Sequence, residues 1–127
     1  MRTSFSIVVD PTTLKQSSLG SITGTICVSG KGWSFPGESW NDFPVVLLGR
    51  WLDVYRDVSS RLGGTGVCRF MDGPYSFRLI SESQELFAVV CLSNEKAVVH
   101  EIHVESRAFQ ELLEAAARTL VRTCRSR

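Results

Sequence analysis

The sequence lacks the long apolar runs that direct a chain to a membrane or to export. No stretch approaches the roughly 20 consecutive apolar residues that a transmembrane helix needs. The first residues, from Met1 to Phe5, do not contain the apolar segment of a signal peptide. We therefore expect a cytoplasmic protein that does not act at a membrane.

A large excess of charge is also missing. The 14 lysine and arginine residues nearly balance 13 aspartate and glutamate residues, and the formal net charge is +1 at pH 7. Domains that bind nucleic acid are usually strongly basic, and proteins that imitate nucleic acid are strongly acidic. The sequence predicts neither class, so we expect no nucleic acid among the partners.

Motifs for metal binding and catalysis are absent. The chain has four cysteines, which are Cys27, Cys68, Cys91 and Cys124, and none of them forms a C-x-x-C pair. Only His100 and His103 could complete a zinc site, but residues three apart on a strand point to opposite faces. The nucleotide-binding, serine-hydrolase and metalloprotease motifs are missing as well. We therefore expect free thiols, no metal, no cofactor and no enzymatic activity.

The composition that remains is that of one globular domain. Of the 127 residues, 43% are hydrophobic and 21% are charged, which are ordinary values for a folded protein. A chain of this length buries a substantial core. We therefore expect residues 1–127 to form a single domain.

The stretch from Trp33 to Leu62 contains all three tryptophans and the longest amphipathic helix. Asn41 and Asp42 are good N-cap residues, and Pro44 suits the first turn of a helix. Apolar residues then recur at three-to-four-residue spacing as far as Leu62, and two glycines follow as a C-terminal cap. The pattern predicts a helix that begins near Pro44 and ends at Leu62, with Trp51 on its buried stripe.

Gly49 lies in the middle of this predicted helix. A glycine in a helix interior costs about 1 kcal/mol relative to alanine. Close packing of a strand or a large side chain against Gly49 would explain that cost.

The lead-in to the helix, residues 31–40, combines loop residues with large aromatics. Its glycines and proline indicate a loop. Either the rings fold back and close the end of the core, with one tryptophan as a hydrophobic staple, or at least one ring is exposed as a binding anchor. In the second case the partner-binding residues are Trp33, Phe35, Glu38, Trp40 and Asp42, with Trp33 as the anchor.

Alternation of apolar and polar residues predicts six strands, at residues 5–10, 21–29, 67–71, 75–80, 86–92 and 97–104. Pro11 is expected to end the first strand, and a polar connection follows. The strand Leu86–Leu92 has no polar residue and therefore belongs near the centre of a sheet. Apolar residues at helical spacing after Ser106 predict a second helix.

The predicted order is β-β-α-β-β-β-β-α, which indicates an α+β fold. We expect a mainly antiparallel sheet of about six strands with both helices packed on one face.

Two segments of the chain resemble segments of short bacterial cytoplasmic proteins. They are GWSFPGESWNDFPVVLLGRWL at residues 32–52 and FMDGPYSFRL at residues 70–79. Some such small α+β proteins are immunity proteins of bacterial toxin systems. The resemblance implies a partner-binding role and assigns no functional residue.

Three functional hypotheses follow. The first is a non-enzymatic protein-binding module, most concretely an immunity protein that neutralises a cognate toxin. The second is a small ligand-binding domain or enzyme with a pocket between sheet and helices, which uses Arg69, Asp72, Tyr75 or a histidine. The third is a subunit that forms a homodimer through its sheet.

Overall fold

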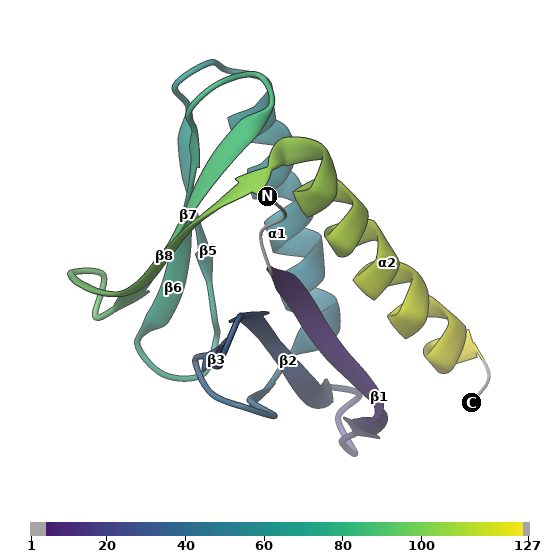
Figure 1. The fold of residues 1–127 in the computed structure, drawn as a ribbon. Coiled ribbons are helices and arrows are strands. Elements are labelled where there is room, and N and C mark those ends of the chain that lie inside the picture. Colours follow the sequence, from purple (N-terminus) through teal and green to yellow (C-terminus); the bar gives the residue numbers. More distant parts are fainter. Residues whose placement is uncertain (1–4, 126–127) are drawn as a thin grey trace.

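The computed structural model of the protein describes residues 5–125, which form two antiparallel sheets and two helices. Both helices lie on one side of the C-terminal sheet, and the N-terminal strands close the lower end of the molecule (Figure 1). The predicted α+β class, with antiparallel pairing and two helices, is confirmed. No helix in the described part of the chain is long and apolar enough to cross a membrane.

The first sheet is built around one central strand. Its strands are β1 (Ser6–Gln16), β2 (Ile22–Gly30), β3 (Trp33–Phe35) and β4 (Asn41–Asp42). β2 pairs with each of the other three, always antiparallel. None of these strands pairs with the strands that follow α1, so the single sheet of about six strands expected from the sequence is instead two sheets of four, with β3 and β4 as additional short strands.

β1 continues beyond Pro11, so the prediction that this proline ends the strand is wrong. The carboxylate of Asp10 accepts hydrogen bonds from the backbone N–H and the hydroxyl of Thr12, at 3.0 and 2.6 Å. The hydroxyl of Thr13 accepts a bond of 2.8 Å from the backbone N–H of Thr25 on β2. The Asp10 and Thr13 side chains thus accept hydrogen bonds where the regular ladder is interrupted, and the strand shifts its register there instead of ending.

α1 (Pro44–Ser59) begins with the predicted proline but lacks the predicted cap. Asn41 and Asp42 form β4, where pairing with β2 holds them extended. The N-cap is therefore Phe43, whose side chain makes no capping bond. The helix buries Pro44, Leu47, Leu48, Trp51, Tyr55 and Val58.

The second sheet is a meander of four strands in sequence order. They are β5 (Thr65–Arg69), β6 (Tyr75–Ser81), β7 (Leu86–Ser93) and β8 (Ala97–Glu105). β7 lies between β6 and β8, and its residues from Phe87 to Leu92 are all buried. The predicted central place of this apolar strand is confirmed.

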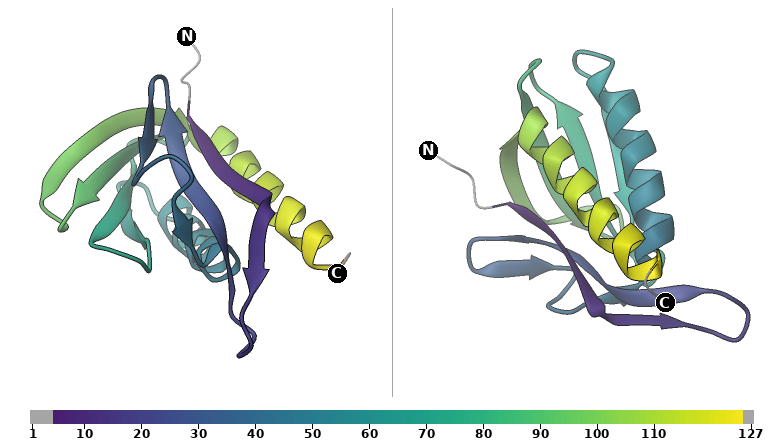
Figure 2. Two further views of the ribbon diagram at one scale, coloured as in Figure 1. Left: turned by 90° about the horizontal axis from the view of Figure 1, so that it is seen from below. Right: turned by 90° about the vertical axis from the view of Figure 1, so that its right-hand side faces the viewer.

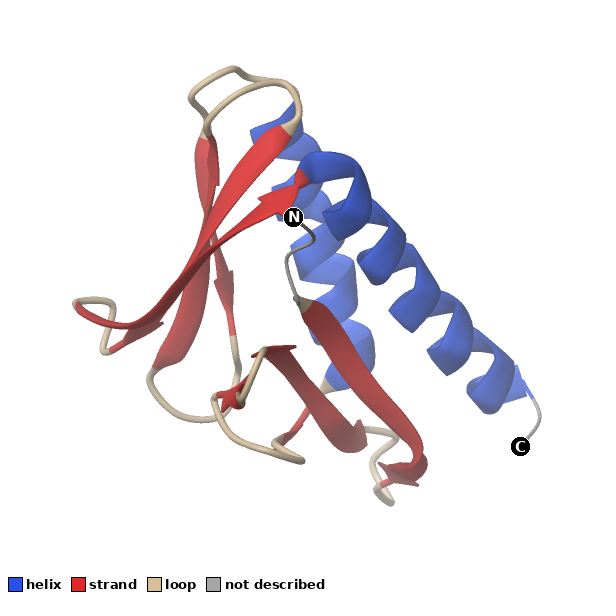
Figure 3. Cartoon of the chain, in the orientation of Figure 1, coloured by secondary structure: helices blue, strands red, loops and turns tan. Residues whose placement is uncertain are grey.

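α2 (Ser106–Arg125) follows β8 directly and runs antiparallel to α1 (Figures 2 and 3). α1 packs on β5 and β6, whereas α2 contacts β8 and the N-terminal strand β1. α2 therefore joins the two sheets. The expected packing of both helices on one face holds for the second sheet (Figure 3).

Aromatic side chains fill the core between the helices and the second sheet. Trp51 of α1 is fully buried, 4.9 Å from Phe77 between ring centroids, and its indole N–H donates to the carbonyl of Arg69. Phe77 in turn meets Phe109 of α2 edge-on at 6.4 Å. α1 lies close to the sheet at Gly66, where an added Cβ would lie 2.7 Å from a methyl group of Val54.

Candidate functional site

The aromatic lead-in closes one end of the core. Trp33 is half-buried and stacks on His100 of β8, with ring centroids 4.0 Å apart and an angle of 11° between the planes. Phe35 is 2% exposed, and Trp40 meets the ring of Tyr75 edge-on at 5.4 Å. The structure thus favours the first of the two alternatives for this segment.

Asp42 is a buried hydrogen-bond acceptor that fixes the position of the lead-in. It is 1% exposed, and its carboxylate accepts three hydrogen bonds. The donors are the indole N–H of Trp40 at 3.1 Å and the backbone N–H groups of Phe43 at 2.8 Å and Asp72 at 3.1 Å. The carboxylate therefore ties together the lead-in, the start of α1 and the β5–β6 turn.

Burial divides the five residues that the sequence suggested for partner contact. Phe35 and Asp42 are buried, so we assign to them the support of the segment rather than contact with a partner. Glu38 is exposed, and Trp33 and Trp40 are half-buried. Partner contact stays a prediction for these last three residues.

The two histidines lie on opposite faces of β8, as predicted. His100 stacks on Trp33, whereas His103 is exposed and pairs with Glu82. Within residues 5–125 no group of three or more histidine, cysteine, aspartate or glutamate side chains could hold a metal ion.

All four cysteines are free, and three of them are buried. Burial raises the thiol pKa of Cys27 and Cys68, and it raises that of Cys91 to about 12. A thiol with a raised pKa carries little thiolate at neutral pH, so these three are poor nucleophiles. Cys124, near the end of α2, is exposed.

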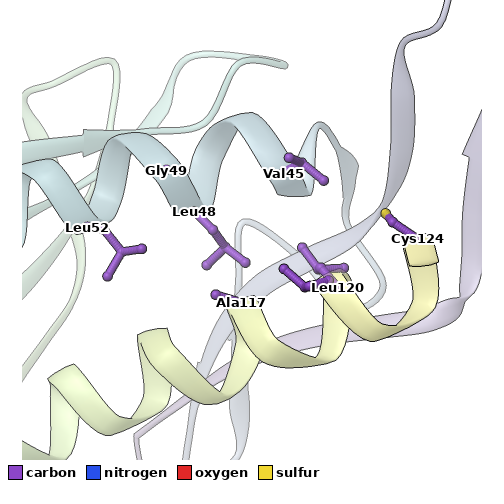
Figure 4. Close-up of a pocket in the computed structure, with 8 residues that line it drawn as sticks. Val45, Leu48, Gly49, Leu52, Ala117, Leu120 and Cys124 are labelled. Carbon is purple, nitrogen blue, oxygen red and sulfur yellow. The ribbon is translucent and has the colours of Figure 1, made fainter.

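An apolar groove runs between α1 and α2 (Figure 4). Its volume is about 430 Å³. The residues that line it are Val45, Leu48, Gly49, Leu52, Ala117, Leu120, Val121 and Cys124. None of these side chains carries a charge, so the groove offers water few hydrogen-bond partners.

Exposed valines extend this apolar surface along α1 and α2. Val45 is 45% exposed, Val121 is 48% exposed, and Val46, next to Val45 on α1, is 43% exposed. Contiguous apolar surface of this kind commonly marks an interaction site.

Gly49 lies in the wall of the groove, and no described residue packs against it. A Cβ added to Gly49 would meet no atom within 4 Å, so the close packing expected from the sequence is wrong. The close approach of α1 to a strand occurs at Gly66 instead. At Gly49 the wall of the groove therefore has no side chain.

The groove continues into a polar section towards the start of α2. This section has a volume of about 310 Å³ and shares Leu52 and Ala117 with the apolar section. Its other lining residues are Tyr55, Arg56, Gln110, Glu114 and Arg118. Two arginines thus face one glutamate, which leaves this section with an excess of positive charge.

A separate polar pocket lies at the turn end of the second sheet, with a volume of about 300 Å³. It brings together Arg69 and Tyr75, two residues of the alternative site suggested by the sequence. Asp72 does not line this pocket, and its backbone N–H is bound to Asp42. The pocket lies at the end of the sheet and not between sheet and helices as expected.

Sequence reasoning missed the helix groove, although two signals were present. The apolar residues of the stretch 44–62 cover more of the helix surface than one sheet can bury. Gly49 lowers the stability of the helix, and no neighbouring residue in the sequence explains why a glycine stands there. Both signals indicate an apolar helix face that is left uncovered.

Comparison of the chain with protein-family models, with curated proteins and with solved structures finds no match. Its function is therefore inferred from the chemistry of the helix groove and the polar pocket.

Proposed function

We propose that this protein is a non-enzymatic binding module that holds an amphipathic helix of a partner protein in the groove between α1 and α2. The observation that carries the proposal is Gly49, a glycine inside a helix whose missing side chain opens an apolar groove and serves no contact within the protein. A groove between two helices is a common receptor for the apolar face of a third helix.

The shape of the groove sets the apolar pattern of the occupant. From Val45 to Leu52 the apolar section spans two turns of α1, about 10 Å along the helix axis. A partner helix with apolar residues at positions i, i+3, i+4 and i+7 presents a stripe of that length. The backbone of the stripe can approach α1 closely at Gly49.

The polar section sets the charge of the occupant. Arg56 is involved in only a weak, exposed ion pair of 4.0 Å with Asp53, and Arg118 has no ion pair among residues 5–125. Both arginines lie where the apolar section ends. A partner helix whose apolar stripe is followed by acidic residues therefore fits both sections.

A designed peptide tests this proposal directly. The probe is a stapled helical peptide with leucines at i, i+3, i+4 and i+7 and glutamates at the end that meets the polar section. Binding is measured by fluorescence anisotropy, and we expect a Kd on the order of 10 µM. A matched peptide with lysines in place of the glutamates should bind at least about tenfold more weakly.

Variants of the protein locate the contact. Gly49→Leu fills the groove and should abolish binding, whereas Arg50→Leu adds the same side chain at an exposed neighbour that does not line the groove and should preserve it. Arg118→Glu should remove the preference for the acidic peptide. Self-association that Gly49→Leu abolishes would instead identify a second copy of the chain as the occupant, and absence of both binding and self-association would refute the groove as a receptor.

The most concrete form of the proposal is neutralisation of a bacterial toxin, since residues 32–52 and 70–79 resemble segments of small proteins some of which are immunity proteins. A toxin gene beside the gene for this chain, whose product is inhibited by the protein but not by Gly49→Leu, supports this form. An operon of metabolic enzymes around the gene would contradict it.

A further inference from the structure

The polar pocket at the end of the second sheet differs in chemistry from the helix groove. It lies where the β5–β6 and β7–β8 turns meet, joined by a hydrogen bond of 2.8 Å from the Asn94 N–H to the Pro74 carbonyl. The residues that line it are Arg69, Phe70, Gly73, Pro74, Tyr75, Ser76, Asn94 and Glu95. Five of these eight residues offer a polar or charged side chain.

Ser76 is buried in this pocket without a partner. The residue is 1% exposed, and its hydroxyl has no hydrogen-bond partner within residues 5–125. A buried hydroxyl left unpaired opposes folding. Ser76 is the cross-strand partner of Arg69, so both side chains lie on the same face of the sheet.

The backbone of the β7–β8 turn, which lines the same pocket, is also strained. Asn94 and Glu95 both adopt positive φ, at 56° and 60°. Two-residue turns of this kind favour asparagine followed by glycine, so glutamate in the second position strains the backbone. Its carboxylate pairs with Arg69, but both side chains are more than half exposed, and such ion pairs stabilise a fold only slightly.

The groups around the pocket are complementary to a small zwitterion. The guanidinium of Arg69 can hold a carboxylate with two hydrogen bonds, and the Ser76 hydroxyl can donate a third. The carboxylate of Glu95 and the amide oxygen of Asn94 can accept hydrogen bonds from an ammonium group. Pro74 and Tyr75 offer apolar surface to a side chain.

We propose that this pocket binds a free α-amino acid, whose carboxylate lies on Arg69 and Ser76 and whose ammonium group lies on Glu95. The ligand enters between Arg69 and Glu95 and replaces their mutual ion pair with two pairs of its own. The proposal does not depend on the helix groove, because the two sites share no residue.

Calorimetric titration of the full chain with three related compounds tests the charge requirement. L-leucine carries both charges, N-acetyl-L-leucine lacks the ammonium group, and L-leucinamide lacks the carboxylate. We expect leucine to bind and each blocked compound to bind at least about tenfold more weakly. Equal affinity for leucine and a blocked compound, or no binding of leucine at millimolar concentration, would overturn the proposal.

Two variants separate ligand binding from a structural role. Ser76→Ala should weaken leucine binding about tenfold without lowering the melting temperature, because the lost hydroxyl has no hydrogen-bond partner among the described residues. Glu95→Gly should weaken binding by at least as much and raise the melting temperature by a few degrees, since glycine suits positive φ. A Ser76→Ala variant that melts earlier and binds leucine normally would show that the hydroxyl is held by an ordered water, which overturns the proposal.

Two controls complete the test. Glu82→Gln removes another exposed glutamate that is paired with His103 outside this pocket, and it should leave leucine affinity unchanged. Gly49→Leu should also leave leucine affinity unchanged, so failure of the groove and failure of this pocket are distinguishable.

Discussion

Two glycines, Gly49 within α1 and Gly66 on the strand beside it, should respond in opposite ways to the same substitution. Gly49→Ala should raise the free energy of unfolding by about 1 kcal/mol, because alanine is the better helix former and its methyl group would meet no atom within 4 Å. For a domain of this size the melting temperature should rise by about 3–5 °C. The variant leaves most of the groove open.

Gly66→Ala should destabilise the protein. Its Cβ would lie 2.7 Å from a methyl group of Val54 and 2.8 Å from one of Val58, although carbon atoms pack at about 3.5–4.0 Å. The helix or the valines would have to move, and overpacking of this kind costs about 1–3 kcal/mol.

Urea denaturation followed by circular dichroism measures both effects. The midpoint of Gly49→Ala should rise and that of Gly66→Ala should fall, with the denaturant slope unchanged in both, because neither substitution alters the surface exposed on unfolding. If Gly49→Ala were destabilising, something would pack against Gly49, and the argument that this glycine serves a partner would be refuted.

Four further predictions concern the core and the lead-in. Trp51→Ala should cost about 3–5 kcal/mol in thermal or urea unfolding, whereas Trp33→Ala removes a half-buried ring and should cost about 1–2 kcal/mol; equal losses would contradict the assigned burial. Asp42→Ala should cost at least about 2 kcal/mol, since it leaves the indole N–H and two backbone donors without their acceptor; a neutral result would mean that water replaces the carboxylate. In the native protein only Cys124 should react quickly with maleimide, and unfolding without reductant should release three more reactive thiols; fast labelling of a buried cysteine would contradict the packing. Hydrogen exchange should be slowest in Leu86–Leu92, and fast exchange there would contradict the central place of β7.

Local patterns in the sequence were sufficient for most of the elements. Both helices follow from apolar residues at a spacing of three to four, and the buried place of β7 follows from a strand without polar residues. The turns around Gly73 and Asn94 follow from residues that tolerate positive φ. Each of these features depends on residues close together in the chain, so a linear reading finds them.

Other features depend on partners that are distant in the chain. Pro11 lies inside a strand because carboxylate and hydroxyl side chains beside it accept hydrogen bonds from backbone N–H groups, and one of these bonds comes from Thr25 on β2. Asp42 belongs to a strand and not to a helix cap because β2 is available to pair with it. The same is true of Trp33, whose stacking partner His100 lies on the other sheet.

The sequence by itself determined that a helix begins at Pro44 with more apolar residues than a single buried stripe needs, and that Gly49 lies inside it at a cost, although the helix ends at Ser59 and not at Leu62. Only the tertiary structure decided which of those residues are covered. α1 turns Trp51 towards the sheet and leaves Val45 and Gly49 beside α2, where the two helices stay far enough apart to form a groove. Hydrophobic periodicity specifies which residues share a helix face, but the packing of neighbouring elements determines how much of that face is removed from water.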